Sequence, residues 1–228
     1  MISRLKWVGV AITVFGLLFI VAGGYAYMKV QDGQRSLNAF SAAQSVKLTY
    51  NDQGQLGTDP EEAAGIMSLL ANDWGYSVDP SELNPNDPII NTASEYMYQM
   101  ATISYHTLHS TVKVTLPADV TTSDGTVVKA GTYDFPVNGK YYANFNRTDP
   151  IEGAARTIAW SPLALSLIGE LGVGAATASS LQMGLGLAAL FGGVGFTFIL
   201  AGLGLVWATR AASETAKVPV LRPAIQPA

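Results

Sequence analysis

Two long stretches without a charged residue constrain this chain more than any other feature. The first covers residues 7–28 and the second covers residues 171–209, whereas charged residues recur regularly between them. An α-helix rises 1.5 Å per residue, so about 20 apolar residues cross the hydrocarbon core of a bilayer. The two stretches predict transmembrane helices towards both ends of the chain, with a folded domain between them.

The first stretch predicts a signal anchor at residues 7–28, after a short segment at residues 1–6. A cleaved signal peptide is the alternative, because Ala22-Gly23-Gly24 offers small residues for cleavage. Signal peptides usually have an apolar core of only about 7–15 residues. The length of this stretch therefore favours a helix that is retained.

The second stretch is too long for one simple crossing. Residues 183–207 are apolar except for Thr197 and predict the crossing itself. Residues 161–181 begin with Ser161-Pro162, a good N-cap followed by a good first helical residue, and they contain Glu170. We expect residues 161–181 to form a juxtamembrane helix in the interface. A third span is the alternative, although a carboxylate within a bilayer is costly.

The distribution of charge predicts the orientation. Arg4, Lys6 and Arg210 flank the two predicted spans, whereas residues 29–160 are strongly acidic in balance. Basic residues beside membrane helices are retained on the cytoplasmic side. The prediction is a two-pass protein of the cell membrane, with both termini in the cytoplasm, including a tail at residues 208–228, and residues 29–160 outside it.

Aromatic residues near the ends of the spans agree with this orientation. Trp and Tyr gather at membrane–water interfaces because their rings are amphipathic. The predicted interface residues are Trp7 and Trp207 on the inner side, and Tyr25, Tyr27 and Trp160 on the outer side.

Small residues recur every four positions in the second span. Such spacing lets helix backbones approach closely in lipid. The predicted packing face comprises two sets, Gly184, Ala188 and Gly192, and Ala189, Gly193, Thr197 and Ala201. The partner is either the first span or another membrane protein, including a second copy of this chain.

The middle domain predicts an α+β fold. Asp59-Pro60-Glu61-Glu62 is a typical helix start, with a capping Asp, Pro at the first position and acids in the first turn, and this helix is expected to reach about Asp73. A second helix is expected at residues 89–109. The first predicted span is also expected to extend past residue 36 before a strand at residues 46–50.

The pattern then changes to alternation with a period of two, typical of strands. Strands are expected at residues 112–116, 126–130, 133–137 and 140–145. Asp124-Gly125 and Asn138-Gly139 fit hairpin turns, which need positive φ. We therefore predict a small antiparallel β-sheet, with residues 133–137 and 140–145 paired across Asn138-Gly139.

The only two histidines of the chain are candidate metal ligands, with Tyr105 or Asp119 as a further candidate. His106 and His109 are three residues apart near the end of the second predicted helix, on one side of it, and this spacing can bind a metal. Methionines precede them, and thioethers suit copper(I). The simpler interpretation is a helix end, where His is favourable against the dipole. No cofactor is predicted.

Motifs for catalysis are absent from the sequence. There is no Gly-x-Ser-x-Gly elbow, no phosphate-binding loop and no His-Glu-x-x-His, so we do not expect an enzyme. The acidic middle domain argues against a nucleic-acid partner. The chain has no cysteine, which favours a bacterial envelope protein over a disulfide-stabilised eukaryotic surface protein.

Two segments carry a resemblance to a known group. They are GLLFIVAGG at residues 16–24, and Thr177-Ala178-Ser179 followed by GLGLAALFGGVGF at residues 184–196. The chain resembles small actinobacterial membrane proteins with two spans, many of which carry the label aromatic ring-opening dioxygenase. Residues 112–145 depart from that group, and the chain lacks the His-rich iron site that such chemistry needs. The resemblance implies no catalytic residue.

Two functions follow as hypotheses. The first is a non-catalytic accessory or scaffolding subunit of a membrane complex, motivated by the small-residue face and the absence of catalytic motifs. The alternative is an extracytoplasmic module, anchored by two helices, that binds or senses a ligand or metal. In both, the lipid bilayer is one partner of the chain.

Overall fold

The computed structural model describes residues 2–215, which divide into two compact units. Within these residues, unit 1 comprises residues 2–35 and 180–215, and unit 2 comprises residues 36–179. Two long helices, α1 (Ile2–Gln44) and α5 (Pro162–Thr215), contribute residues to both units. Each unit is described by itself.

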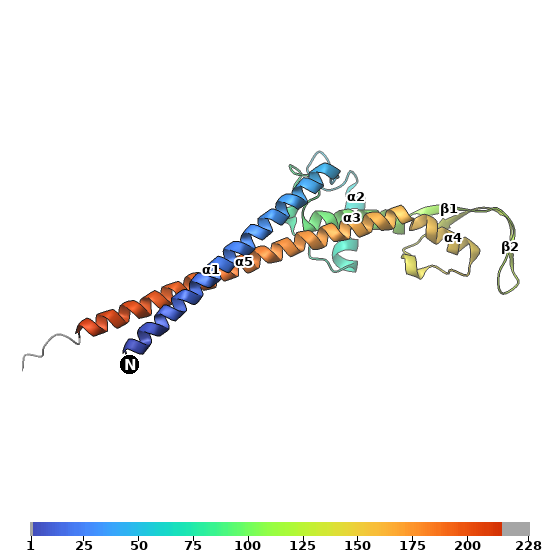
Figure 1. Cartoon of the computed structure of the whole chain (residues 1–228). Helices are drawn as coiled ribbons and strands as arrows, with labels where there is room; N and C mark the ends of the chain where they lie inside the picture. Colours follow the sequence, from blue (N-terminus) through green and yellow to red (C-terminus); the bar gives the residue numbers. More distant parts are fainter. Residues whose placement is uncertain (1, 216–228) are drawn as a thin grey trace, which may run out of the picture. The chain divides into compact units, whose positions relative to one another are not determined.

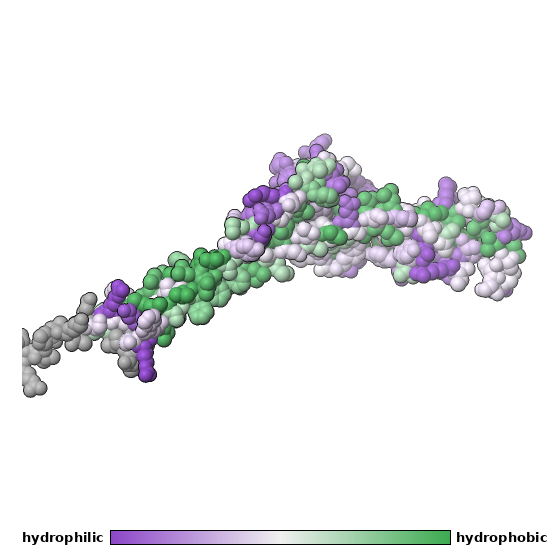
Figure 2. Space-filling view, viewed as in Figure 1, coloured by the Kyte–Doolittle hydropathy of each residue, from purple (hydrophilic) through white to green (hydrophobic). Residues whose placement is uncertain are grey.

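Unit 1 is a pair of apolar helical segments. Both α1 and α5 contain a segment long and apolar enough to cross a membrane. Figure 2 shows hydrophobic surface over most of the visible face of this pair. Large apolar side chains such as Phe15 and Leu190 are exposed on it. Soluble monomers rarely expose contiguous apolar patches of this extent.

No break divides the second apolar stretch. Residues 161–181 and residues 183–207 were expected to form separate helices, but both lie in the single helix α5. The residues at the expected break, Leu181-Gln182-Met183, all favour helix, so the chain has no local reason to turn there. A third crossing would need such a turn, and α5 has none.

In unit 1 the two helices run antiparallel along a seam of small residues (Figure 1). A Cβ placed on Gly9 would lie 2.8 Å from the Gly202 oxygen, and one on Gly16 would lie 2.7 Å from the Gly195 oxygen. A Cβ on Gly23 would lie 3.0 Å from the Ala188 oxygen. Contacts this short show that the two backbones touch directly.

The seam has a period of seven residues on both helices. Gly9, Gly16 and Gly23 on α1 face Gly202, Gly195 and Ala188 on α5, and all six are buried. A repeat of seven keeps one seam facing a partner helix along a left-handed pair. Phe19 packs beside the seam, with its ring centroid 5.8 Å from that of Phe191 and 5.9 Å from that of Phe198.

The structure places the two predicted small-residue sets differently. In the first set, Ala188 is buried. A Cβ placed on Gly184 would lie 2.7 Å from Val30 Cγ2. The Gly192 nitrogen lies 3.1 Å from the position of a Cβ on Gly23. The second set is exposed, namely Ala189, Gly193, Thr197 and Ala201. The first set thus packs on α1, and the second does not.

Unit 2 begins with helices whose starts follow the capping rules. Helix α2 (Pro60–Ser68) has Asp59 as its N-cap, which accepts from the Glu61 N–H, and continues into the π-helical turn η1 (Leu69–Asp73). Helix α3 (Ala93–Leu108) begins with a capping box between Thr92 and Glu95. The helices predicted at residues 59–73 and 89–109 are therefore present, the second with a later start.

The segments before α3 tie the end of α1 to the rest of unit 2. Helix α1 ends at Gln44, and Ser45 adopts a left-handed φ of 54°. The chain then forms single bridges rather than the expected strand, with Lys47 opposite Ile89 and Tyr50 opposite Leu56. A short 3-10 turn, η2 (Pro80–Glu82), precedes α3.

The β-structure is a two-stranded antiparallel ribbon in two parts (Figure 1). Strand β1 (Thr111–Leu116) pairs with β4 (Gly131–Pro136), from Thr111 opposite Pro136 to Leu116 opposite Gly131. Strands β2 (Val120–Thr121) and β3 (Val127–Val128) pair beyond them, around a turn in which Gly125 has φ 85°. The prediction of a small antiparallel sheet is confirmed.

One predicted hairpin is wrong. Residues 133–137 were expected to pair with residues 140–145, but β4 pairs with β1, and residues 142–144 form the 3-10 turn η3 (Tyr142–Asn144). The turn itself exists, because Asn138 and Gly139 have φ of 49° and 75°. Phe145 is buried in the core, which draws this segment away from the ribbon.

Helix α4 (Pro150–Ala159) closes the core of unit 2. Its N-cap, Asp149, accepts from the N–H groups of Ile151 and Glu152, each at 2.8 Å. The core gathers side chains from η1, α3, both long strands and α4, and its buried members are Leu69, Leu108, Val114, Leu116, Val137, Phe145, Ala155 and Trp160.

Trp160 corrects one predicted membrane-interface residue. Its side chain is only 4% exposed, its Nε1 donates to the Lys140 carbonyl oxygen at 2.9 Å, and its ring stacks on Tyr141. A ring enclosed in a protein core cannot also lie among lipid headgroups. The assignment of Trp160 to the outer interface is therefore wrong.

Candidate functional site

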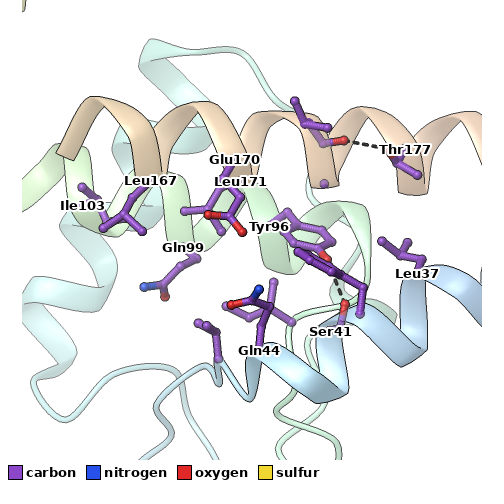
Figure 3. Close-up of a pocket in the computed structure, with 15 residues that line it drawn as sticks. Leu37, Ser41, Gln44, Tyr96, Gln99, Ile103, Leu167, Glu170, Leu171 and Thr177 are labelled. Carbon is purple, nitrogen blue, oxygen red and sulfur yellow. Dashed lines mark hydrogen bonds between the residues drawn. The ribbon is translucent and has the colours of Figure 1, made fainter. Parts of the chain in front are cut away.

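Unit 2 contains an apolar cavity of about 550 Å³ (Figure 3). Its walls come from the last turns of α1, from α3, and from the first half of α5. The lining residues are Leu37, Phe40, Ser41, Gln44, Val46, Ile90, Tyr96, Gln99, Ile103, Leu167, Glu170, Leu171, Val173, Gly174 and Thr177. A volume of this size falls within the range of small-molecule sites, about 300–1,000 Å³.

A buried hydrogen bond joins two walls of the cavity. Ser41 Oγ on α1 and Tyr96 Oη on α3 lie 2.9 Å apart, and both residues are buried. Glycine at position 174 lets α5 approach the same ring, because a Cβ there would lie 2.5 Å from Tyr96 Cε1. Tyr96 is therefore the residue on which all three helical walls meet.

Three polar side chains face the cavity without a partner among the described residues. They are Glu170 on α5, Gln99 on α3 and Gln44 on α1 (Figure 3). The other polar lining groups are already satisfied, since Ser41 bonds Tyr96 and Thr177 Oγ1 donates to the Val173 oxygen at 2.8 Å. The cavity thus combines an apolar wall with one carboxylate and two amides.

The cavity is open to the outside. Phe40 is 49% exposed and Glu170 is also exposed, although both line it. The lining contains no histidine, cysteine, lysine or arginine, and its one serine is bonded to Tyr96. Apolar walls with a few polar groups are the usual composition of a small-molecule binding site.

The two histidines point to different partners. His106 Nε2 lies 3.1 Å from Glu62 Oε1 on α2. His109 lies over Tyr105, with 4.0 Å between ring centroids and 2.8 Å from His109 Nδ1 to the Tyr105 carbonyl oxygen. Within residues 2–215 no three His, Cys, Asp or Glu side chains gather as a metal site would require. The geometry favours their interpretation as helix-end residues.

The remaining predicted interface aromatics are exposed in unit 1. Trp7, Tyr25 and Tyr27 lie on α1 and Trp207 lies on α5. Lys29 Nζ is 5.9 Å from the ring centroid of Tyr25, a cation–π contact. Their exposure leaves these rings free to meet lipid headgroups, which stays a prediction.

A second group of titratable residues lies buried near α3 and has a structural role. Burial raises the pKa of Glu95, whose carboxylate accepts from the N–H groups of Asn91 and Thr92, each at 2.9 Å. Burial also raises the pKa of Tyr98 to about 12. The hydroxyls of Tyr98 and Tyr50 have no hydrogen-bond partner among the described residues.

Sequence reasoning did not find the cavity. Glu170 drew attention only as a charge inside an apolar stretch, and Gln44, Tyr96 and Gln99 belong to no motif. The available signal was the extension of α1 past Arg35, where Leu37 and Ser41 share one helical face. That face indicates packing, but it does not reveal an incompletely filled space beside it.

Comparisons with protein-family models, with curated proteins and with solved structures found no match to this chain.

Proposed function

We propose that this chain is a two-pass membrane protein whose unit 2 binds an apolar or amphipathic small molecule without catalysing a reaction on it. The cavity carries the proposal, because it has the volume, the apolar walls and the few unpaired polar groups of a small-molecule site. The ligand-binding hypothesis from the sequence is thereby favoured, with an organic ligand in place of a metal.

Two observations support the membrane anchoring. Both α1 and α5 contain a segment long and apolar enough to span a bilayer, and the basic residues Arg4, Lys6 and Arg210 lie just outside the uncharged stretches at residues 7–28 and 171–209. We propose the cell membrane of a bacterium as the location, with unit 2 outside and both termini in the cytoplasm.

The absence of cysteine makes this orientation easy to test. Single-cysteine variants Ser123→Cys, in the ribbon turn, and Ser3→Cys, before the first span, are treated in intact cells with a maleimide that does not cross membranes. The expected result is labelling at position 123 only, with labelling at position 3 after the cells are opened. Labelling at position 3 in intact cells would refute the orientation.

Binding is tested by filling the cavity. Ile103→Trp places a large ring against the lining, whereas Ile158→Trp adds the same ring on an exposed part of α4. We expect dodecyl-chain photolabels carrying a diazirine to cross-link residues of α3 in the native chain and in Ile158→Trp. The Ile103→Trp variant should lose most of this cross-linking. Equal cross-linking in all three proteins would show that the cavity is not the binding site.

A second candidate function is that of an accessory subunit of a membrane complex, or of a self-associating chain. One observation favours it, namely that Ala189, Gly193, Thr197 and Ala201 form a small-residue stripe on α5 that α1 leaves exposed. Gly193→Ile should abolish cross-linking to a partner in cells, whereas Leu187→Ile, on an exposed non-stripe position, should not. A monomer in mild detergent with no cross-linked partner in cells would remove this candidate.

A further inference from the structure

We infer that the ligand of the cavity is an amphiphile whose polar head is a protonated amine, held by Glu170 with the amides of Gln44 and Gln99. This inference rests on the proposed function and specifies the ligand class for the same site. It is carried by the identity of the polar groups in the lining and by the absence of any cation there.

The charge of the lining selects the head group. Glu170 is the only charged residue among those that line the cavity, and no described residue is paired with it. Lys47 follows the lining residue Val46 but does not line the cavity itself. A carboxylate or phosphate head would meet Glu170 as a like charge, whereas a protonated amine would pair with it.

The hydrogen-bonding capacity of the site also fits an amine. A protonated primary amine has three N–H donors and no acceptor. Carboxylate and amide oxygens are acceptors, and the cavity supplies one carboxylate and two amides that are otherwise unpaired among the described residues. Hydrogen bonds between an ammonium and a carboxylate are charge-assisted and are about twice as strong as neutral ones.

The apolar wall fits a hydrocarbon chain beside that head. Leu37, Ile90, Ile103, Leu167 and Leu171 line the cavity together with the ring of Phe40. These side chains offer contact surface but no further hydrogen bonds, so they favour an alkyl chain over a second polar group. An amine with a long alkyl chain satisfies both parts of the site.

The test compares three photolabels that share a dodecyl chain with a diazirine and differ only in the head, which is an amine, a carboxylate or an alcohol. The full chain is used in a non-ionic maltoside detergent, so the surfactant contributes no charged head. Cross-links to peptides of α3 are quantified by mass spectrometry. Because Glu170 is exposed, the amine label should exceed each of the others by about two- to fivefold, as a charge pair in contact with solvent predicts.

Glu170→Gln should reduce this preference to near unity, because the amide is isosteric but uncharged. Glu61→Gln, on the exposed start of α2 and outside the cavity, is the matched control and should retain the full preference. A preference that survives Glu170→Gln would overturn the inference. Equal labelling by the three heads would overturn it as well but would leave the proposed binding function standing, whereas no labelling by any head would remove both.

A second arm separates the two sources of such an amine. The chain is reconstituted in phosphatidylcholine vesicles with or without phosphatidylethanolamine. Both lipids carry a phosphate, so they differ only in the terminal group, which is a primary amine in phosphatidylethanolamine. Competition by phosphatidylethanolamine against the amine label would support the inference with a membrane lipid as the source. Undiminished labelling would support it with a free long-chain amine as the source.

Discussion

Replacing Gly16 by alanine tests the glycine seam of unit 1. The added Cβ would lie 2.7 Å from the Gly195 oxygen and 2.8 Å from both the nitrogen and Cγ1 of Ile199. Carbon atoms in contact normally lie about 3.5–4.0 Å apart, so the helices must separate locally by roughly 0.5–1 Å. A gap of that size forfeits about a quarter to a half of the dispersion energy of the contacts it opens.

The expected cost follows from this crowding. Overpacking of a close-packed interface costs about 1–3 kcal/mol. Gly24→Ala is the matched control on the same helix, since nothing lies within 4 Å of a Cβ there. Alanine is favoured over glycine in a helix by up to about 1 kcal/mol, so the control should be neutral or slightly stabilised. Both variants gain the same helix propensity, so they should differ by the overpacking cost alone, roughly 1–3 kcal/mol in the free energy of helix separation.

Steric trapping measures that free energy. Biotin labels are attached through cysteines at Tyr27 and Leu187, which are exposed on α1 and α5, and no native cysteine competes. Two streptavidin molecules can bind at the same time only when the helices are separated. The apparent affinity of the second streptavidin molecule therefore reports the free energy of helix separation. If Gly16→Ala proves as stable as Gly24→Ala, the direct backbone contact along the seam is refuted.

Three further predictions concern unit 2. Trp160→Ala should destabilise unit 2 by about 3–5 kcal/mol in thermal or urea unfolding, as loss of a core ring does, whereas Trp207→Ala, at an exposed position, should not. Asp149→Ala should cost about 1 kcal/mol through loss of the α4 N-cap, and Asp73→Ala, an exposed residue without a described side-chain bond, should be neutral by the same measurement. Tyr98→Phe should stabilise unit 2 by about 1 kcal/mol near neutral pH, because it removes a buried hydroxyl without a partner. Since the pKa of Tyr98 is raised to about 12, the unfolded chain ionises this group first, and native stability should fall between pH 10 and 12 more steeply than in Tyr98→Phe.

Capping residues near the start of a helix can be recognised from the local sequence. Asp59-Pro60 gave the start of α2 because a capping carboxylate and a fixed proline φ act within a few residues. Asp149-Pro150 carries the same signal and starts α4 in the same way. This second helix start was therefore predictable from local sequence alone, although no helix was predicted there.

Strand pairing could not be obtained from the turn alone. Asn138-Gly139 forms a turn with positive φ, and the Lys140 N–H donates to the Val137 oxygen at 3.1 Å. A turn of this kind permits a hairpin but does not require one. The segment after it enters the core through Phe145, and β4 pairs with a strand about 20 residues earlier in the chain. That choice depends on what the whole core buries.

The packing face was predicted in part, because one helix was considered without its partner. Spacing of four on α5 marked two candidate faces, and only contact with α1 distinguishes them. The decisive pattern is the match between Gly9, Gly16 and Gly23 and a repeat of the same length on α5. The cavity was beyond sequence reasoning for a related reason, since its walls come from three helices that are remote in the chain.

The outer half of the β-ribbon has a practical consequence. Strands β2 and β3 form only two residue pairs, and most of their side chains are exposed on a turn held by its own polar residues. Backbone hydrogen bonds with so little apolar cover open locally at low free energy, so their amides should exchange with solvent soon after dilution into heavy water. Such a turn also tolerates insertions. A protease recognition sequence placed between residues 123 and 124 would cut the chain on demand while the core beneath the ribbon stays folded.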